Sequence, residues 1–394
     1  MDFTDSDRAF LLATLKLAEK GLFSTTPNPR VGCILVKQGR VVGTGFHHRA
    51  GGDHAEVEAL KAAGSEGARG ATAYISLEPC SFRGRTGACT SALIKAGVAR
   101  VVCAMEDPHP RVSGAGIMAL RQAGIQAETC VDAEVYQAAA ALNCGYLRRV
   151  TSGLPWVRLK MAASLDGRTA MSSGESQWIT GAEARSDVQY WRARSCAIVT
   201  GVGTLLADDP RLDVREQQYR LDGILRQPLV VVLDHSLRGD PNAQVFRKAG
   251  HEATRNGSQA NPRVLLVTQC RDENRLRSFQ KPGVDIFQPP DRGIQARDVL
   301  KKLAESGCNE VLVEAGATLM GHFVDCNAWQ EALVYLAPKL FGASARPLVT
   351  NTFQKMSEVP GFQFADCTRF GNDLRLLVQN RVIDNTDQKP KDKR

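Results

Sequence analysis

The pattern that most constrains this chain is His54-Ala55-Glu56, followed at a distance by Pro79-Cys80 and then by Cys89. Imidazole and thiolate are ligands that zinc prefers, and three protein ligands leave a fourth position open for water. If a helix begins at His54, the side chain of Glu56 can lie beside the metal-bound water and transfer protons to and from it. The fold must therefore bring one His and two Cys side chains together.

The order of these residues follows a known pattern, in which H-x-E precedes P-C-x-x-C in zinc-dependent deaminases. Here eight residues, not two, separate Cys80 from Cys89. A purely structural zinc site is the alternative, but such sites have four protein ligands as a rule. We therefore predict a catalytic zinc held by His54, Cys80 and Cys89, with Glu56 as the proton carrier.

The first 149 residues alternate between the sequence patterns of strands and helices, which is typical of an α/β domain. We expect helices at 7–20, 54–63, 89–96, 114–123 and 133–147, and strands at 31–36, 40–45, 71–77, 98–104 and 125–130. These elements predict a three-layer domain. Two adjacent helices begin at the motif residues, and the partial positive charge of a helix N-terminus favours thiolate and hydroxide.

A basic stretch that ends in Ser-Gly-Leu-Pro, 148–155, suggests a domain boundary, so we expect a second domain at 150–383 and a disordered tail at 384–394. The second domain also reads as α/β, with an antiparallel end. Strands are expected at 155–163, 195–200, 229–233, 264–268, 310–314, 329–336 and 362–378, and helices at 181–194, 295–306 and 317–325. Thr180 and Glu183 fit a capping box for the first of these helices.

Glycine-rich turns in this second domain indicate a site for an anionic ligand. Gly201-Val202-Gly203-Thr204 follows a strand but lacks the third glycine of a dinucleotide fingerprint. The segment 316–322 has the glycine spacing of a P-loop without its Lys, so triphosphate hydrolysis is disfavoured, although helix amides there can bind an anion. Arg192, Arg211 and Arg215 are available for a phosphate.

Composition adds limits on location and partners. The net charge of +8 suits phosphorylated small molecules and does not require nucleic acid. There is no apolar run of membrane-spanning length, and the acidic start Met1–Asp5 is unlike a signal peptide. Eleven cysteines, several in apolar stretches, indicate reduced thiols and a metal pair. We therefore expect a cytoplasmic protein that binds neither membranes nor nucleic acid. We also expect a homo-oligomer, a dimer or a tetramer, although no feature of the sequence reveals the oligomeric state.

Several motifs together resemble the bifunctional deaminase–reductase family of riboflavin biosynthesis. They are 54–56, 77–80, the spacer 84–89 and Thr26-Pro27-Asn28-Pro29 with Val31-Gly32. The family often has two prolines before the second Cys, where this chain has Gly87-Ala88. The resemblance implies a cytidine-deaminase-like first domain and a diaminopyrimidinone substrate with a ribosylamino 5′-phosphate. It also implies that Asn28, His47 and Arg85 contact that substrate.

The second domain resembles the reductase half of the same family, which has a dihydrofolate-reductase-like fold and uses NADPH. The resemblance is strong over about 5–215 and 305–340. It implies that the cofactor is lined by Ala162, Trp178, Thr204, Asp208, His235, Gly316, Ala317, Thr318, Leu319, Met320, Gly321 and His322. It implies that the substrate is lined by Ser176, Arg192, Leu212, Arg215 and Glu314, with Lys160 near both.

The resulting hypothesis is a two-step enzyme with one zinc per chain and NADPH, which deaminates the pyrimidine and then reduces the ribosyl group to a ribityl chain. No side chain of the second domain stands out as a proton donor. Two alternatives remain open. A tRNA adenosine deaminase would have the short C-x-x-C spacing and would leave the second domain unexplained. A non-catalytic binding protein would consume no NADPH.

Overall fold

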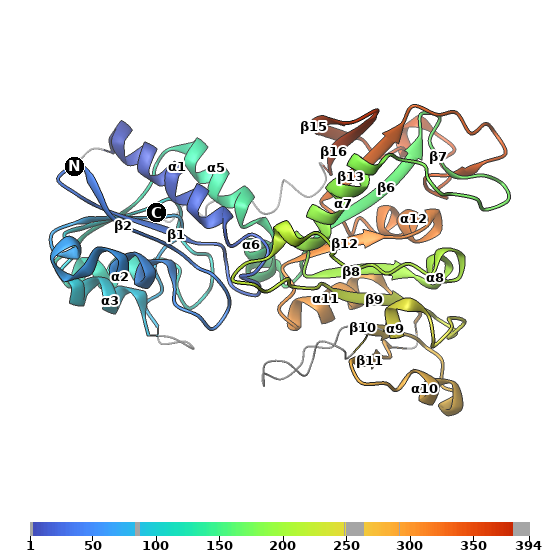
Figure 1. The fold of residues 1–394 in the computed structure, drawn as a ribbon, viewed down its shortest axis with the longest axis horizontal. Coiled ribbons are helices and arrows are strands. Elements are labelled where there is room, and N and C mark those ends of the chain that lie inside the picture. Colours follow the sequence, from blue (N-terminus) through green and yellow to red (C-terminus); the bar gives the residue numbers. More distant parts are fainter. Residues whose placement is uncertain (1–2, 83–86, 248, 250–263, 291, 381–394) are drawn as a thin grey trace. The chain divides into compact units, whose positions relative to one another are not determined.

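The computed structural model describes residues 3–82, 87–247, 249, 264–290 and 292–380, which form two compact units (Figure 1). Unit 1 extends to Leu154 and also contains Arg220–Arg226; the rest of the described chain from Pro155 onward is unit 2. The units divide a few residues after the predicted boundary, since a helix continues through Ser152. Arg85 and the predicted tail 384–394 lie outside the described residues.

Unit 1 is built on a five-stranded sheet in the order β2-β1-β3-β4-β5. Its strands are β1 (Gly32–Lys37), β2 (Arg40–Phe46), β3 (Thr72–Ile75), β4 (Arg100–Cys103) and β5 (Gln126–Thr129). Its helices are α1 (Asp5–Glu19), α2 (Ala55–Ala68), α3 (Cys89–Ala96), α4 (Ala115–Gln122), α5 (Ala133–Leu142) and α6 (Cys144–Ser152). β1 is antiparallel to β2 and β3, and β3, β4 and β5 are parallel.

Helices cover both faces of this sheet, so the predicted three layers are confirmed. Alternate strand residues point to opposite faces. Cys33 and Leu35 of β1 pack in one core with α2, α3 and α4, whereas Ile34 and Val36 pack in another with α1, α5 and α6.

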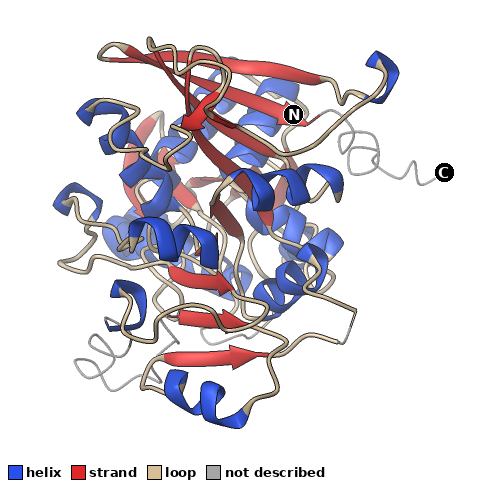
Figure 2. Cartoon of the chain, turned by 90° about the vertical axis from the view of Figure 1, so that its right-hand side faces the viewer, coloured by secondary structure: helices blue, strands red, loops and turns tan. Residues whose placement is uncertain are grey.

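Unit 2 contains a nine-stranded sheet in the order β11-β10-β9-β8-β12-β6-β13-β16-β15 (Figures 1 and 2). The strands are β6 (Trp156–Ser164), β8 (Ala197–Gly201), β9 (Leu229–Leu233), β10 (Val264–Val267), β11 (Val284–Phe287), β12 (Glu310–Glu314), β13 (Glu331–Ala337), β15 (Phe362–Phe370) and β16 (Asp373–Asn380). The strands from β11 to β13 are parallel, and β16 and β15 form the predicted antiparallel end.

The helices of unit 2 connect these parallel strands. They are α7 (Ala182–Arg194), α8 (Val202–Asp208), α9 (Gln244–Arg247), α10 (Glu273–Phe279), α11 (Ala296–Glu305) and α12 (Ala317–Asp325). The short β7 (Arg168–Ala170) and β14 (Arg346–Pro347) pair separately, and two single turns of 3-10 helix span Gln217–Tyr219 and Met356–Glu358. A dinucleotide has room at the carboxyl edge of such a sheet.

Three local predictions are wrong in detail. The predicted helix 133–147 is interrupted at Asn143, whose side chain bonds the backbone of Arg30 instead. The predicted strand 362–378 is a hairpin that turns at Gly371, where φ is +60°. The N-cap of α7 is Gly181 with no side-chain cap, so the capping box from Thr180 is absent. None of the described helices is long and apolar enough to span a bilayer.

Candidate active sites

The side chains of His54, Cys80 and Cys89 meet in unit 1, as the spacing predicts. The His54 Nδ1 atom lies 3.1 Å from the Cys89 Sγ atom and 3.7 Å from the Cys80 Sγ atom, and all three ligand atoms fall within 4.8 Å of one another. One imidazole and two sulfurs are a donor set that suits zinc and leaves one position open. These residues therefore fit a catalytic zinc ion.

Helix α2 carries two of the predicted residues, and it approaches the sheet very closely. A Cβ atom on Gly45 would lie 2.4 Å from the Ala55 carbonyl oxygen, and one on Gly43 would lie 2.3 Å from the Ala59 carbonyl oxygen. Only glycine fits at either position, so the first turns of α2 pack directly against the backbone of β2. His54, at the N-cap of α2, and Glu56, in its first turn, are thereby fixed against the core.

The loop that supplies Cys80 is held by the buried carboxylate of Glu78. One of its oxygens accepts the backbone N–H groups of Gly116 and Ile117 at 2.8 and 3.3 Å, at the start of α4. The other oxygen accepts those of Asp107 and Gly114 at 3.2 and 3.0 Å. Carboxylates that accept several backbone N–H groups are strongly held. Glu78 thus fixes the backbone two residues before Cys80, a candidate metal ligand.

The two thiols are close enough to share a proton. The Cys89 thiol donates to Cys80 and lowers the pKa of Cys80 to about 4, and His54 contributes to the same shift. The pKa of Cys89 is raised correspondingly, first by that hydrogen bond and then by burial. A thiolate is the form that binds metal, so the low pKa of Cys80 favours the form that a metal site requires.

Glu56 is only 3% exposed and lies against Cys89. Burial is the largest influence on its carboxyl group and raises the pKa of Glu56, while the positive charge of His54 opposes that shift. A carboxyl group with a raised pKa exchanges protons more readily near neutral pH. Its position beside Cys89 and His54 is suitable for proton transfer at a metal held by these side chains.

Asn28 and His47 form a polar pair next to these ligands. The Asn28 side-chain nitrogen lies 3.0 Å from His47 Nε2, and His47 Nδ1 lies 2.9 Å from the Asp53 carbonyl oxygen. A carbonyl only accepts, so Nδ1 carries the hydrogen and Nε2 accepts from the amide. Burial lowers the pKa of His47 and keeps the ring neutral. The ring of His47 stands edge-on to that of His54, with centroids 5.2 Å apart.

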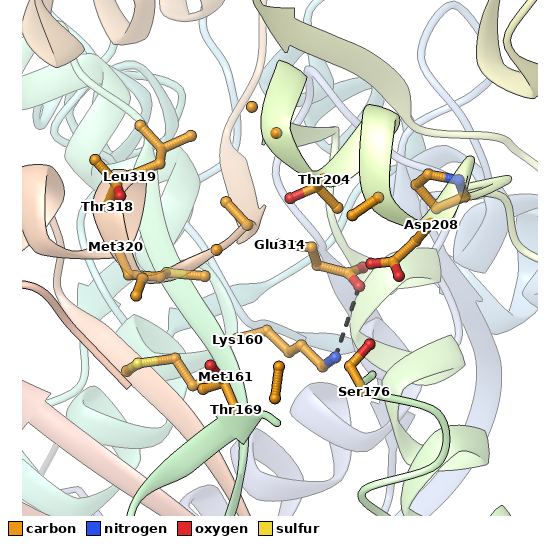
Figure 3. Close-up of a pocket in the computed structure, with 18 of the residues that line it drawn as sticks. Lys160, Met161, Thr169, Ser176, Thr204, Asp208, Glu314, Thr318, Leu319 and Met320 are labelled. Atoms are coloured by element: carbon orange, nitrogen blue, oxygen red, sulfur yellow. Dashed lines mark ion pairs between the residues drawn. The ribbon is translucent and has the colours of Figure 1, made fainter. Parts of the chain in front are cut away.

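A large cavity of about 1450 Å³ opens in unit 2 at the carboxyl ends of β6, β8, β9 and β12. Lys160 on β6 and Glu314 on β12 project into it, with Lys160 Nζ 3.9 Å from a Glu314 oxygen (Figure 3). Arg192 of α7 donates to both Glu314 oxygens at 2.6 and 2.9 Å. This bidentate pair fixes the carboxylate in the cavity wall.

Charge and burial shift the pKa values of this group. Burial lowers the pKa of Lys160, although Glu314 opposes that shift. Burial acts to raise the pKa of Glu314, but Arg192 and Lys160 outweigh it and the pKa is lowered. The carboxylate is therefore ionised and can accept hydrogen bonds from a ligand.

The cavity contains nearly all the residues predicted for the second site. The residues found in its wall are Lys160, Ala162, Ser176, Trp178, Arg192, Thr204, Asp208, Leu212, Arg215, His235, Glu314, Gly316, Ala317, Thr318, Leu319, Met320 and His322. Gly321 is an exception: a Cβ atom there would lie 2.8 Å from Asn351 Oδ1, so this glycine faces the segment at Asn351. Gly316 is the N-cap of α12 with no side-chain cap, and open space surrounds the position of a Cβ atom there. Backbone amides and this wall fit a dinucleotide.

Other wall residues were not predicted from the sequence. They include Ser236 and Arg238 after β9, Arg185 on α7 and Arg346 on β14. Ser236 and Arg238 could have been predicted, because they belong to a polar segment that directly follows a strand. Arg346 had no such signal, because β14 is only two residues long.

Two family models match the chain. The RibD C-terminal domain matches residues 155–376, and the cytidine and deoxycytidylate deaminase zinc-binding region matches residues 4–105. The riboflavin biosynthesis protein RibD of Escherichia coli is 43% identical over 379 residues, which cover 94% of this chain and 98% of the relative. The chain belongs to the RibD family. It is accordingly a bifunctional deaminase and reductase of riboflavin biosynthesis that uses zinc and NADPH.

Solved structures of the RibD family agree with both halves of the fold. Acinetobacter baumannii RibD is 39% identical, with a TM-score of 0.85 over 95% of this chain and 98% of that one. A Thermotoga maritima protein is 29% identical, with a TM-score of 0.79 over 95% and 99%. The latter is described as a diaminohydroxyphosphoribosylaminopyrimidine deaminase and 5-amino-6-(5-phosphoribosylamino)uracil reductase. The cytidine-deaminase-like and dihydrofolate-reductase-like domains are thus confirmed.

Proposed function

We propose that His54, Cys80 and Cys89 hold the zinc ion and that Glu56 is the catalytic residue of the deaminase. Bound zinc supplies an activated water at its open position. Glu56 takes a proton at its carboxylate and delivers it to the departing amine. The burial of the Glu56 carboxyl group against Cys89, in the first turn of α2, is the observation that carries this assignment.

We propose 2,5-diamino-6-(5-phosphoribosylamino)pyrimidin-4-one as the substrate of this first step. The neutral pair of Asn28 and His47 lies beside the ligands and orients polar groups of the pyrimidine. We assign Arg85 to the same substrate on the resemblance alone. The product, which has lost one amino group as ammonia, is the substrate of the second site.

At the second site, we propose that the product is reduced to 5-amino-6-(5-phosphoribitylamino)uracil. NADPH supplies the hydride to C1 of the opened ribosyl group. Ala162, Trp178, Thr204, Asp208, His235 and the start of α12 hold the cofactor, and Ser176, Leu212 and Arg215 hold the substrate beside Lys160, Arg192 and Glu314. The chain contributes placement and charge complementarity, which lower the barrier by orientation.

We also propose a homo-oligomer in the cytoplasm. The hairpin of β15 and β16 leaves Phe364 71% exposed, with Phe362 and Leu374 also exposed, at the end of the sheet. Apolar edge strands are commonly covered by a partner. Buried thiols such as Cys33 and Cys103, which form no disulfide, suit a reducing compartment.

The substitution Glu56→Gln tests the proposed function. In the full chain it should abolish ammonia release from the diaminopyrimidinone phosphate, while NADPH oxidation with the deaminated product continues. Glu66→Gln, on the exposed side of the same helix, is the matched control and should leave both rates unchanged. Loss of both activities in Glu56→Gln with its zinc content intact would contradict two separate sites.

A further inference from the structure

Asn28 lies in a turn between α1 and β1, so neither a helix nor a strand fixes its side chain. Its own N–H donates to the Thr25 carbonyl oxygen at 2.9 Å, and its side-chain nitrogen donates to His47. The amide oxygen of Asn28 has no hydrogen-bond partner among the described residues, which leaves it available to a substrate. The position of that oxygen depends on what holds the turn.

Asn143, far along the chain, holds the backbone two residues after Asn28. The Asn143 Oδ1 atom accepts the Arg30 N–H at 2.8 Å, and its Nδ2 atom donates to the Arg30 carbonyl oxygen at 2.9 Å. A primary amide both donates and accepts, so it matches the two polar groups of one backbone residue. Asn143 is only 1% exposed, so water cannot readily replace either bond.

Asn143 makes these bonds in place of a helix cap. It stands between α5 and α6, with φ −109° and ψ 19°, and it is the N-cap residue of α6. Asparagine is among the residues that most often cap a helix by accepting from its first N–H groups. The Asn143 side chain makes no such bond to α6. The interruption of the helix thus places the amide against Arg30 without capping α6.

Arg149, on α6, holds the other side of the same turn. Its Nη2 atom donates to the Pro27 carbonyl oxygen at 3.0 Å. The guanidinium group also lies over the ring of Tyr146, 5.9 Å from its centroid. Pro27 directly precedes Asn28, so the segment from Asn143 to Arg149 binds the backbone on both sides of Asn28.

The bonds from Asn143 also bear on His47, the partner of Asn28. The His47 N–H donates to the Val31 carbonyl oxygen at 2.9 Å, and Val31 directly follows Arg30. The contact with Arg30 therefore fixes the start of β1, to which the backbone of His47 is attached. Both members of the polar pair are placed relative to each other through Arg30 and Val31.

We infer that Asn143 and Arg149 are positioning residues of the deaminase, which hold the turn 27–30 so that the Asn28 amide meets the pyrimidine. This rests on the proposed contact between Asn28 and the substrate. Both residues act through Asn28. A misplacement of about 1 Å in a group that orients a substrate can lower the rate by about 100-fold.

A double-mutant cycle on the full-length protein tests this inference, with ammonia release from the diaminopyrimidinone phosphate as the assay. Asn28→Ala and Asn143→Ala should each lower kcat/KM by about 10-fold to 100-fold. Zinc content, and NADPH oxidation with the deaminated product, should not change. Because Asn143 acts through Asn28, the double variant should be no slower than Asn28→Ala alone, whereas independent effects would multiply.

Two further variants separate positioning from stability. Val135→Ala truncates a fully buried side chain of α5 without touching the turn, so it should lower stability and leave kcat/KM unchanged. Arg149→Met removes the half-buried guanidinium and keeps an apolar stem, so it tests the inference even if Asn143→Ala does not fold. It should lower kcat/KM in the same non-additive way, and Arg149→Lys, which keeps a donor, should lose less.

The outcomes distinguish the inference from the proposed function. If Asn28→Ala releases ammonia at the unmodified rate, the proposed substrate contact fails and the inference fails with it. If Asn28→Ala is slow but Asn143→Ala and Arg149→Met are not, the inference alone fails. It also fails alone if their effects multiply with that of Asn28→Ala, or if Val135→Ala is equally slow.

Discussion

The substitution Glu78→Gln should uncouple the Cys80 loop from helix α4. The buried carboxylate accepts four backbone N–H groups, two on each oxygen, from Asp107, Gly114, Gly116 and Ile117. Glutamine has nearly the same shape, but its amide nitrogen replaces one of the two accepting oxygens. That nitrogen then faces two N–H donors and can bond neither.

The expected magnitude follows from these contacts. A hydrogen bond to a charged group contributes about 1.5–3 kcal/mol, so the loss of two reduces the free energy of unfolding by roughly 3–6 kcal/mol. A domain has only about 5–15 kcal/mol in total. Because Cys80 lies two residues away, zinc affinity should also fall by about 10-fold to 100-fold, as it does when groups that support a metal ligand are removed.

The assay is chelator competition for zinc on the full chain, together with denaturant unfolding of the same samples. The control is Glu106→Gln, since Glu106 is exposed and close to the same loop. It should change neither quantity. The reasoning is refuted if Glu78→Gln keeps the zinc affinity and the unfolding free energy of the unmodified protein, because the four bonds would then contribute nothing.

Two further predictions concern other buried charges. Burial disfavours the charged form of Asp7, but hydrogen bonds from Arg100 and Tyr74 prevail and hold the pKa of Asp7 well below its usual range. This stabilisation is present above about pH 4 and is lost as the pH falls further. The unfolding free energy of unit 1 should therefore vary less between about pH 4 and 2 in Asp7→Asn than in the unmodified protein, which an acid titration of stability measures. The same dependence of unfolding free energy on pH in both proteins would contradict the assignment. Arg192→Lys removes the bidentate pair with Glu314 and should raise the KM of NADPH-dependent reduction about tenfold without affecting ammonia release. An equal loss in both reactions would indicate misfolding instead.

Much of the metal site could be predicted from sequence because its information is local. His54 and Cys89 stand at helix starts, and each helix follows from periodicity and from a glycine near its end. The role of Glu78 could not be predicted in this way. Its partners are backbone groups 29 to 39 residues later in the chain, and a backbone N–H leaves no pattern in the sequence.

The second site shows the same limit. Parallel strands that end in polar residues predicted where ligands gather, and the cavity there contains nearly all the predicted residues. Arg238 and Arg346 look like any other arginine in the sequence. Their distinguishing property is their place in the cavity wall, which depends on where the fold puts the turn after β9 and the short strand β14. The interruption of the predicted helix at Asn143 could not be predicted either, because it depends on hydrogen bonds between the Asn143 side chain and the backbone of the distant Arg30.

X-ray absorption at the zinc edge of the full-length protein tests the central claim most directly. The account predicts one zinc per chain with one nitrogen at about 2.0–2.1 Å, two sulfurs at about 2.3 Å and one exchangeable oxygen. The nitrogen and sulfurs are those of His54, Cys80 and Cys89. A fully active protein without zinc, or a zinc ion with four protein ligands and no exchangeable position, would contradict it.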